Sequence, residues 1–150
     1  MTILAAVDET ERSKQVVEIA YDLATTYDDE FVALHVIPEE EYESHATAVK
    51  EIPGFGDYSL SQQEESARNF THRFVMETLD EDIDLDQFRP LGRVGDIPEQ
   101  ILSVTEQVDP RFLVIGGRRR TPAGKAIFGD RAQQILLKAD CPVVSQFVDV

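Results

Sequence analysis

The chain has 150 residues, of which 42% are hydrophobic, so it can bury the core of one domain but not of two full domains. It contains no run close to the roughly 20 apolar residues that span a bilayer, and Asp8 and Glu9 come too early for a signal peptide. The 29 acidic residues outnumber the 14 basic ones and give a formal net charge of -15, which disfavours nucleic acid as a partner. We expect a single cytoplasmic domain over residues 1–150, with neither a membrane nor a nucleic-acid partner.

The excess of acidic residues also bears on stability. Like charges on one surface repel each other at low salt, whereas molar salt shortens the Debye length to about 3 Å and removes most of that cost. We therefore interpret the composition as an adaptation to a salt-rich cytoplasm. The single cysteine, Cys141, excludes an internal disulfide and is expected to be a small buried side chain just before a strand.

Apolar runs mark the first elements. Ile3–Val7 and Phe31–Ile37 are predominantly apolar runs of strand length and predict two buried strands. Between them, apolar residues from Val16 to Ala24 recur with helical spacing and predict a helix, for which Thr10 or Ser13 can serve as the N-cap. This opening is typical of a strand, helix and strand unit with parallel strands.

The middle of the chain begins with an acidic stretch. Residues 39–58 carry glycines and a proline but no sustained period, and they predict a long surface loop. A helix is expected from about Ser59 to Leu79, followed by a strand over Phe88–Val94. Asp96 is then the expected N-cap of a further helix, which has Pro98 in its first turn.

The remaining apolar segments complete the fold. Phe112–Ile115 and Val143–Val148 predict two more strands, and residues 126–139 contain the last helix. Apolar strands that alternate with helices indicate a parallel sheet with helices on both faces, a doubly wound α/β fold. In such sheets ligands bind at the carboxyl ends of the strands where the winding reverses, which here brings Asp8 and Gly116 to one crevice.

A basic segment follows the fourth predicted strand. Residues 118–131 hold five basic residues and one acidic residue, whereas the rest of the chain holds nine basic residues against 28 acidic ones. Glycines allow close backbone approach, the following helix offers unpaired N–H groups, and arginine pairs bidentately with phosphate. The pattern favours an anion site, and the alternative is a solvated loop whose arginines pair with carboxylates of the surface or of a partner subunit. No Walker motif or dinucleotide-binding glycine motif is present.

Four positions carry a resemblance to a known family. Asp8 follows the first strand, Val36 lies at the end of the second, and Gly116 and Gly129 stand thirteen residues apart. In these features, and in the order of elements along essentially the whole chain, the sequence resembles the universal stress proteins. The resemblance implies an adenine nucleotide alpha hydrolase-like fold with sheet order 3-2-1-4-5, and ATP or AMP as the ligand, with Mg²⁺. It implies ligand contacts from Ala6, Val7, Asp8, Val36, Ile115, Gly116, Arg118, Arg119, Gly129, Asp130 and Arg131.

Two positions depart from that family's Gly-x2-Gly-x9-Gly-Ser/Thr motif. Arg119 stands in place of the second glycine, and Asp130 in place of the hydroxyl residue. A carboxylate beside a phosphate costs on the order of 1 kcal/mol at 4 Å even in a water-like medium, which Arg131 or a bridging metal ion can offset. Asp130 can equally be the N-cap of the last helix, a purely structural role.

Structural roles also account for other candidate residues. Asp8 suits a turn or a helix cap as well as an adenosine contact, and the backbone alone can require Gly116 and Gly129. His35 is expected to be a satisfied core or rim histidine, and the wide spacing of the histidines gives no metal site. We therefore expect no catalytic residue and no metal-ligating residue in this chain.

Three functions are compatible with these residues. The first is a nucleotide-binding regulatory module of the stress response, and the second is an interaction protein of the same fold with an altered phosphate loop. The third is an enzyme that cleaves ATP, but the signatures that such enzymes carry near the first strand are absent. An apolar terminal strand at a sheet edge invites pairing, and the resemblance implies a homodimer through residues 143–148. Other protein partners are not identified by the sequence.

Overall fold

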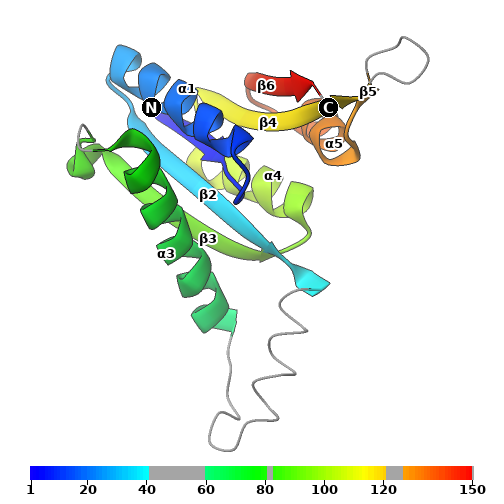
Figure 1. The fold of residues 1–150 in the computed structure, drawn as a ribbon, viewed down its shortest axis with the longest axis horizontal. Helices are drawn as coiled ribbons and strands as arrows, with labels where there is room; N and C mark the ends of the chain where they lie inside the picture. Colours follow the sequence, from blue (N-terminus) through cyan, green and yellow to red (C-terminus); the bar gives the residue numbers. More distant parts are fainter. Residues whose placement is uncertain (41–59, 81–82, 121–126, 150) are drawn as a thin grey trace, which may run out of the picture.

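The computed structural model describes residues 1–40, 60–80, 83–120 and 127–149, with the backbone alone at 118–120, 127–128 and 148–149 (Figure 1). Most of the loop predicted at 39–58 lies outside this part of the chain. The elements in chain order are β1 (Thr2–Ala6), α1 (Arg12–Tyr27), β2 (Glu30–Pro38), α3 (Leu60–Leu79), the short 3-10 helix η1 (Leu85–Gln87), β3 (Phe88–Gly95), α4 (Ile97–Val108), β4 (Phe112–Arg120), β5 (Ile127–Phe128), α5 (Asp130–Lys138) and β6 (Val143–Asp149). None of the described helices is long and apolar enough to cross a membrane.

The parallel strands of the described chain form one sheet in the order β3-β2-β1-β4-β6. This confirms the predicted doubly wound sheet of order 3-2-1-4-5, in which β6 is the fifth predicted strand. β1 lies at the centre, where Ala5 pairs with Ala33 of β2 on one side and with Val114 of β4 on the other. Because the winding reverses between β2 and β4, the carboxyl ends of β1 and β4 meet at the switch point of the sheet.

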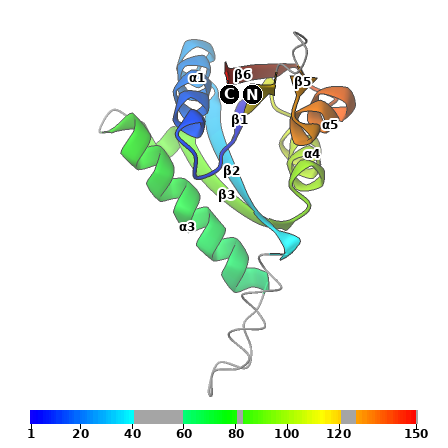
Figure 2. The same cartoon turned by 45° about the vertical axis from the view of Figure 1, so that its right-hand side comes forward.

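Helices cover both faces of the sheet, with α1 and α3 on one face and α4 and α5 on the other (Figure 2). Successive strand residues point to opposite faces, so each strand contributes to two cores, and this explains why the strands read as continuous apolar runs. The core under α1 and α3 includes Ile3, Ala5, Val7, Val16, Val17, Ala20, Phe31, Ala33, Val75 and Val114. The core under α4 and α5 contains Leu4, Val32, Leu34, Val36, Ile101, Val104, Leu113, Ile115, Ala132 and Ile135.

β4 is longer than the strand predicted at Phe112–Ile115 and continues to Arg120. Glycine is disfavoured in strands, but here the parallel ladder with β6 holds these residues in place. β5 pairs antiparallel with the end of β4, and Arg119 pairs with Phe128 of β5 on one side and with Asp149 of β6 on the other. β6 pairs along one side of β4. On the other side, β1 pairs with the first residues of β4 and β5 pairs with the last ones. The segment predicted to be a basic loop therefore begins as a β-hairpin.

The starts of α4 and α5 differ in how well the sequence predicted them. As predicted, Asp96 is the N-cap of α4, and its carboxylate accepts a hydrogen bond from the backbone N–H of Glu99 at 3.1 Å. For α5, of the two roles left open for Asp130, that of N-cap is excluded, because Gly129 occupies the cap position directly after β5. Asp130 is instead the first helical residue, where its negative charge still interacts favourably with the helix dipole.

A partly buried ion pair joins the amino ends of two strands, at the end of the sheet opposite the cavity. Asp29, just before β2, has a side chain that is 2% exposed and accepts a hydrogen bond from Nε of Arg111 at 2.7 Å. Arg111 stands just before β4, and its guanidinium lies 4.3 Å from the ring centroid of Tyr27. The hydrogen bond from Arg111 outweighs the effect of burial and lowers the pKa of Asp29. This pair links the segments that precede β2 and β4 at the end of the sheet opposite the switch point.

Candidate functional site

A cavity of about 470 Å³ opens at the carboxyl ends of β1 and β4, within the size range of small-molecule sites. Part of its lining is apolar and comes from β2, β4, α4 and α5. These side chains belong to the core under α4 and α5, or pack against it: Leu34, Val36, Ile97, Ile101, Ile115, Ala132 and Ile135. The cavity thus offers an apolar surface to the apolar part of a ligand.

The polar part of the lining comes from the β1–α1 turn and from the start of α5. All predicted contact residues whose side chains the structure describes line this one cavity: Ala6, Val7, Asp8, Val36, Ile115, Gly116, Gly129, Asp130 and Arg131. The side chains of Arg118 and Arg119 lie outside the described residues. Arg12, Ser13 and His35 also line the cavity, although they were not among the predicted contact residues. The predicted positions are therefore brought together, while their contact with a ligand stays a prediction.

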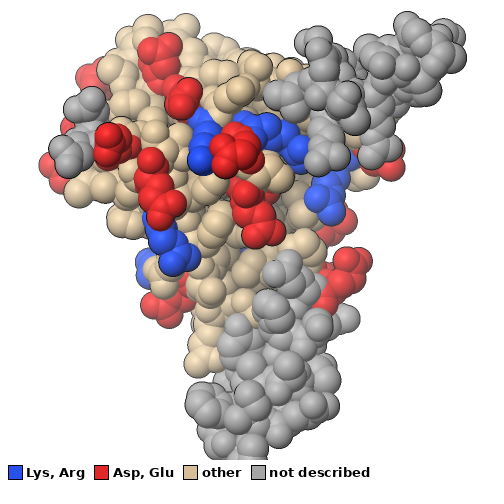
Figure 3. Space-filling view, viewed as in Figure 1, with Lys and Arg blue, Asp and Glu red and all other residues tan. Residues whose placement is uncertain are grey.

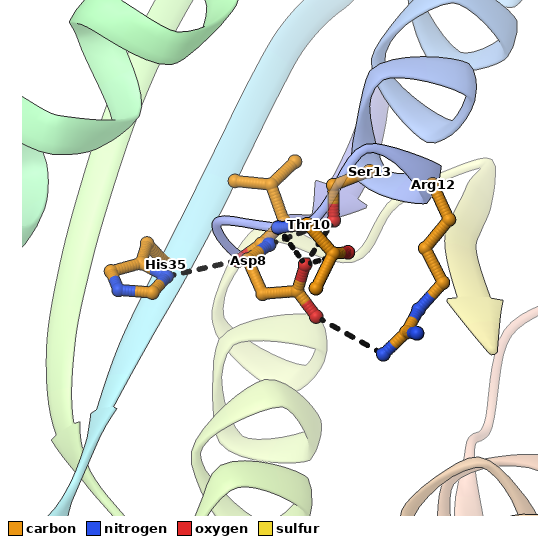
Figure 4. A network of polar contacts seen from close by, with 6 residues as sticks. Asp8, Thr10, Arg12, Ser13 and His35 are labelled. Atoms are coloured by element: carbon orange, nitrogen blue, oxygen red, sulfur yellow. Dashed lines mark hydrogen bonds and ion pairs between the residues drawn. The ribbon is translucent and has the colours of Figure 1, made fainter. Parts of the chain in front are cut away.

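Asp8 organises the turn between β1 and α1 (Figure 4). Its Oδ1 accepts hydrogen bonds from the backbone N–H of Thr10 at 2.9 Å, from the hydroxyl of Ser13 at 2.8 Å and from the hydroxyl of Thr10. The Ser13 oxygen in turn accepts a hydrogen bond from the N–H of Asp8 at 2.9 Å. The N-cap position of α1 is Glu11, so the prediction of Thr10 or Ser13 was wrong, because Asp8 engages both hydroxyls. One role of Asp8 is thus to hold this turn.

The carboxylate of Asp8 also places a negative charge at the cavity. Partial burial opposes its ionisation, but the hydrogen bonds from Thr10 and Ser13 and the charge of Arg12 together lower its pKa. Oδ1 is committed to the turn, whereas Oδ2 faces Nη2 of Arg12 at 3.6 Å. The side chain is 46% exposed, so a ligand in the cavity meets a carboxylate with an arginine beside it.

His35 links β2 to the end of β1 by a hydrogen bond. Its Nδ1 lies 3.0 Å from the carbonyl oxygen of Val7, and because a carbonyl can only accept, Nδ1 carries the hydrogen. The N–H of Val7 donates to the carbonyl of Leu34 at 2.8 Å, so both polar groups of Val7 are tied to β2. The ring packs against Phe70 of α3 with centroids 4.5 Å apart. His35 is a satisfied rim histidine, as expected, and Nδ1 is not available as a base.

The two glycines of the predicted motif have different physical roles. A Cβ on Gly116 would stand 2.9 Å from Cγ2 of Val16, so the close packing of α1 on β4 requires a glycine there. Gly129 has φ of -63° and ψ of 156°, which any residue adopts, and a Cβ there would meet no atom of the described residues within 4 Å. The prediction that the backbone requires Gly129 was therefore wrong. Among the described residues, the space beside Gly129 at the start of α5 is open.

Charges of both signs line the cavity. Asp130 and Arg131 are exposed in the first turn of α5, and the cavity is also lined by Asp8 from the β1–α1 turn and by Arg12 from the start of α1. Acidic and basic side chains are also interspersed across the face shown in Figure 3. Arg12 was missed because its contact with the cavity depends on the orientation of α1. Its spacing of four residues before Val16, which faces the sheet, is the sequence signal that indicates the same helix face.

The described residues contain little that could perform chemistry. Among them, no group of three or more His, Cys, Asp and Glu side chains is arranged to hold a metal ion. Ser13, the buried hydroxyl of the cavity, is engaged by Asp8, and Cys141 is partly buried away from the cavity, with its pKa raised by burial.

The sheet and its cavity define the class of protein: a doubly wound α/β protein with a ligand-sized cavity at its switch point. The model of the universal stress protein family matches residues 1–145. The chain belongs to that family, as its motif residues had indicated.

Individual relatives agree with this assignment. The chain is 39% identical to a universal stress protein from Mycolicibacterium smegmatis over 57 residues, which are 38% of this chain and only 42% of that protein. Two structures of the universal stress protein from Archaeoglobus fulgidus, one of them in complex with dAMP, match 97% of this chain with TM-scores of 0.63 and 0.58 at 22% and 18% identity. They are covered to 97% and 96%. A universal stress protein in complex with cAMP gives a TM-score of 0.66 at 9% identity, over 97% of this chain and 95% of that one.

Proposed function

We propose that this protein is a dimeric, cytoplasmic adenine-nucleotide binding module with a regulatory role in the stress response, and not an enzyme. The observation that carries the proposal is the cavity at the switch point, which joins an apolar wall to a polar rim with open space at Gly129. The complexes of related proteins with dAMP and cAMP support adenine nucleotides as the ligand class.

The lining suits the two parts of a nucleotide. Val36 and Ile115 belong to the apolar wall, which can accept a flat base, and Asp8 stands beside it as an acceptor for ribose hydroxyls. Phosphate groups fit the start of α5, because the first turn of a helix presents unpaired N–H groups and Gly129 leaves room for an anion to approach them. The residues present thus fit ATP or AMP.

Magnesium fits the site as a companion of the phosphates. Mg²⁺ is usually held by one or two carboxylates together with phosphate oxygens, and Asp130 is a carboxylate in the first turn of α5. A cation there would neutralise the repulsion between Asp130 and a nucleotide. Asp130 would then be a ligand of the ion, in the position that the family motif gives to a hydroxyl.

The free edge of the sheet supports a homodimer. β6 pairs with β4 along one edge, and no described strand pairs with the other. Its residues Val143, Val144 and Phe147 are only partly buried, and α5, the preceding helix in the chain, exposes Leu137 to 76%. An unpaired apolar edge strand favours pairing with a second copy. A monomeric mass at molar salt in analytical ultracentrifugation would remove this part of the proposal.

Thermal denaturation with and without ligand tests nucleotide binding. AMP, and ATP with magnesium, at 100 times their dissociation constants should each stabilise the protein by about 2.7 kcal/mol. Magnesium pyrophosphate and GMP serve as controls for the phosphates and for the base. Absence of any shift with millimolar AMP and ATP would exclude the nucleotide function, and release of AMP and pyrophosphate from ATP would show an enzyme instead.

One observation favours the alternative of an interaction protein that binds no nucleotide. The carboxylate of Asp130 lines the cavity where phosphate is expected and makes no ion pair with any other described residue. If this charge excludes nucleotides, the fold and dimer edge would serve to bind other proteins. The thermal shift experiment separates the two functions.

A further inference from the structure

Arg12 occupies a position that the family motif does not include. It is the first residue of α1 and lines the cavity. Val16 lies one helical turn later on the same face and packs against Gly116, its Cγ2 standing 2.9 Å from where a Cβ of that glycine would be. The helix therefore directs residue 12 over the carboxyl end of β4, the end at which phosphate is expected.

The ion pair with Asp8 engages only one nitrogen of the Arg12 guanidinium. Its Nη2 lies 3.6 Å from Oδ2 of Asp8, which is the single ion pair it makes among the described residues (Figure 4). The pair formed by Arg111 and Asp29 is much closer, at 2.7 Å from Nε to Oδ2. A guanidinium has five N–H donors in a fork that matches phosphate oxygens. Arg12 is thus placed by Asp8 without being fully engaged by it.

The turn itself does not depend on Arg12. The hydrogen bonds that close it converge on Oδ1 of Asp8 and come from Thr10 and Ser13, whereas Arg12 approaches Oδ2. Removal of the Arg12 charge therefore leaves the bonds of the turn in place. This separates a role toward a ligand from a role in folding.

The charge balance of the cavity also depends on Arg12. The described charged side chains of the lining are Asp8, Asp130, Arg12 and Arg131, two of each sign. Arg131 is exposed, whereas the Arg12 side chain is only 24% exposed, so water screens its charge less. Without Arg12 the described lining would be net negative and would repel an anion.

We propose that Arg12 binds the phosphate of the nucleotide and that Asp8 is the residue that positions it. This inference rests on the proposed nucleotide function and adds to it the cation that offsets Asp130. It assigns Asp8 a second role toward the ligand, exerted through Arg12. The ligand class that this arrangement recognises is an adenosine phosphate, in preference to adenosine itself.

Isothermal titration of AMP and of adenosine against Arg12→Gln tests the inference. The variant should bind AMP about 10-fold or more weakly than the wild type, as expected for loss of a charge-assisted hydrogen bond, and should bind adenosine as before. Lys14→Gln is the matched control, because Lys14 has the same charge on the same helix but pairs with Glu11 outside the cavity. It should leave both affinities unchanged, and Arg12→Lys should retain part of the preference for AMP.

The other outcomes overturn the inference in distinguishable ways. If the wild type binds AMP and Arg12→Gln binds it equally well, Arg12 is no phosphate ligand and the proposed function stands. If Arg12→Gln loses adenosine as well as AMP and melts at a lower temperature, the role of Arg12 is structural. If the wild type binds neither compound, the proposed function fails and this inference fails with it.

Discussion

The contrast between Gly116 and Gly129 leads to a prediction about what each glycine is for. A methyl group on Gly116 would stand 2.9 Å from Cγ2 of Val16, which is fully buried, so that one of the two must shift. Overpacking of this kind costs about 1–3 kcal/mol, and in a chain of this length each kcal/mol lowers the melting temperature by about 2–4 °C. Gly116→Ala should therefore melt several degrees below the wild type, whether or not a ligand is present.

Gly129→Ala should behave in the opposite way. The backbone angles at Gly129 suit alanine, and its Cβ would meet no atom of the described residues within 4 Å, so the described structure has room for it. Alanine is a poorer N-cap than glycine, at a cost on the order of 1 kcal/mol, but it restricts the unfolded chain and recovers about 0.4–1 kcal/mol. We expect a change in stability within about 0.5 kcal/mol. The affinity for AMP should fall about 10-fold or more, because the methyl group keeps phosphate away from the N–H groups of α5.

Differential scanning calorimetry of both variants, with a parallel AMP titration, measures the two effects. A Gly129→Ala variant as unstable as Gly116→Ala would show that folding requires this glycine and that the space beside it has no bearing on a ligand. Unchanged affinity of Gly129→Ala for AMP would show that no phosphate approaches the start of α5.

Three further predictions concern charge. Asp130→Ser should bind ATP without magnesium about 5-fold more tightly, because it removes a repulsion on the order of 1 kcal/mol, and an unchanged dissociation constant would place Asp130 away from the phosphates. Asp29→Asn should melt below the wild type at neutral pH; because the folded-state pKa of Asp29 is lowered, this difference should be complete above about pH 4 and shrink as pH falls through that lowered pKa, which melting curves across acid pH would show. The wild type, with its net charge of -15, should melt at a higher temperature in molar KCl than in low salt, and a flat salt dependence would count against adaptation to a salt-rich cell.

Most of the sheet could be predicted because its residues satisfy simple rules. The run at Ile3–Val7 is buried on both faces, as parallel strands are, and the alternation of strands with helices restricts the topology to few choices. Asp96 could be predicted as a cap because an N-cap acts locally, through a backbone N–H three residues away. Local pattern was not sufficient at the start of α1, where Asp8 engages the hydroxyls of Thr10 and Ser13 and Glu11 is the N-cap.

The end of β4 could not be predicted because its structure depends on distant residues. Gly116 and Gly117 have little tendency to form strands, and the apolar run ends at Ile115. What extends the strand is its pairing with β6, including Gly117 with Phe147, which lies thirty residues later in the chain. The same hairpin with β5 decides where α5 begins, so the error about the cap of α5 followed from the error about the strand.

The candidate site was predictable to the extent that topology determines it. The rule that ligands bind where the winding reverses was enough to bring Asp8 and Gly116 together, because it concerns the ends of strands. It could not indicate Arg12, since the orientation of α1 on the sheet follows from the packing of Val16 against Gly116. A glycine that the core requires therefore also determines which side chain of α1 reaches the cavity.

This coupling explains why loss of binding by itself says little about a residue of this cavity. Gly116 is needed for α1 to pack, Asp8 for the turn to close, and both also line the place where a ligand would bind. Substitution at either position alters folding and binding together. Gly129 and Arg12 differ. Among the described residues, a Cβ on Gly129 would meet nothing within 4 Å, and Arg12 makes one long ion pair that the turn does not need. If a ligand depends on these two residues, it is recognised by groups that folding does not require. Such a dependence would distinguish a binding site from a cavity that results from packing alone.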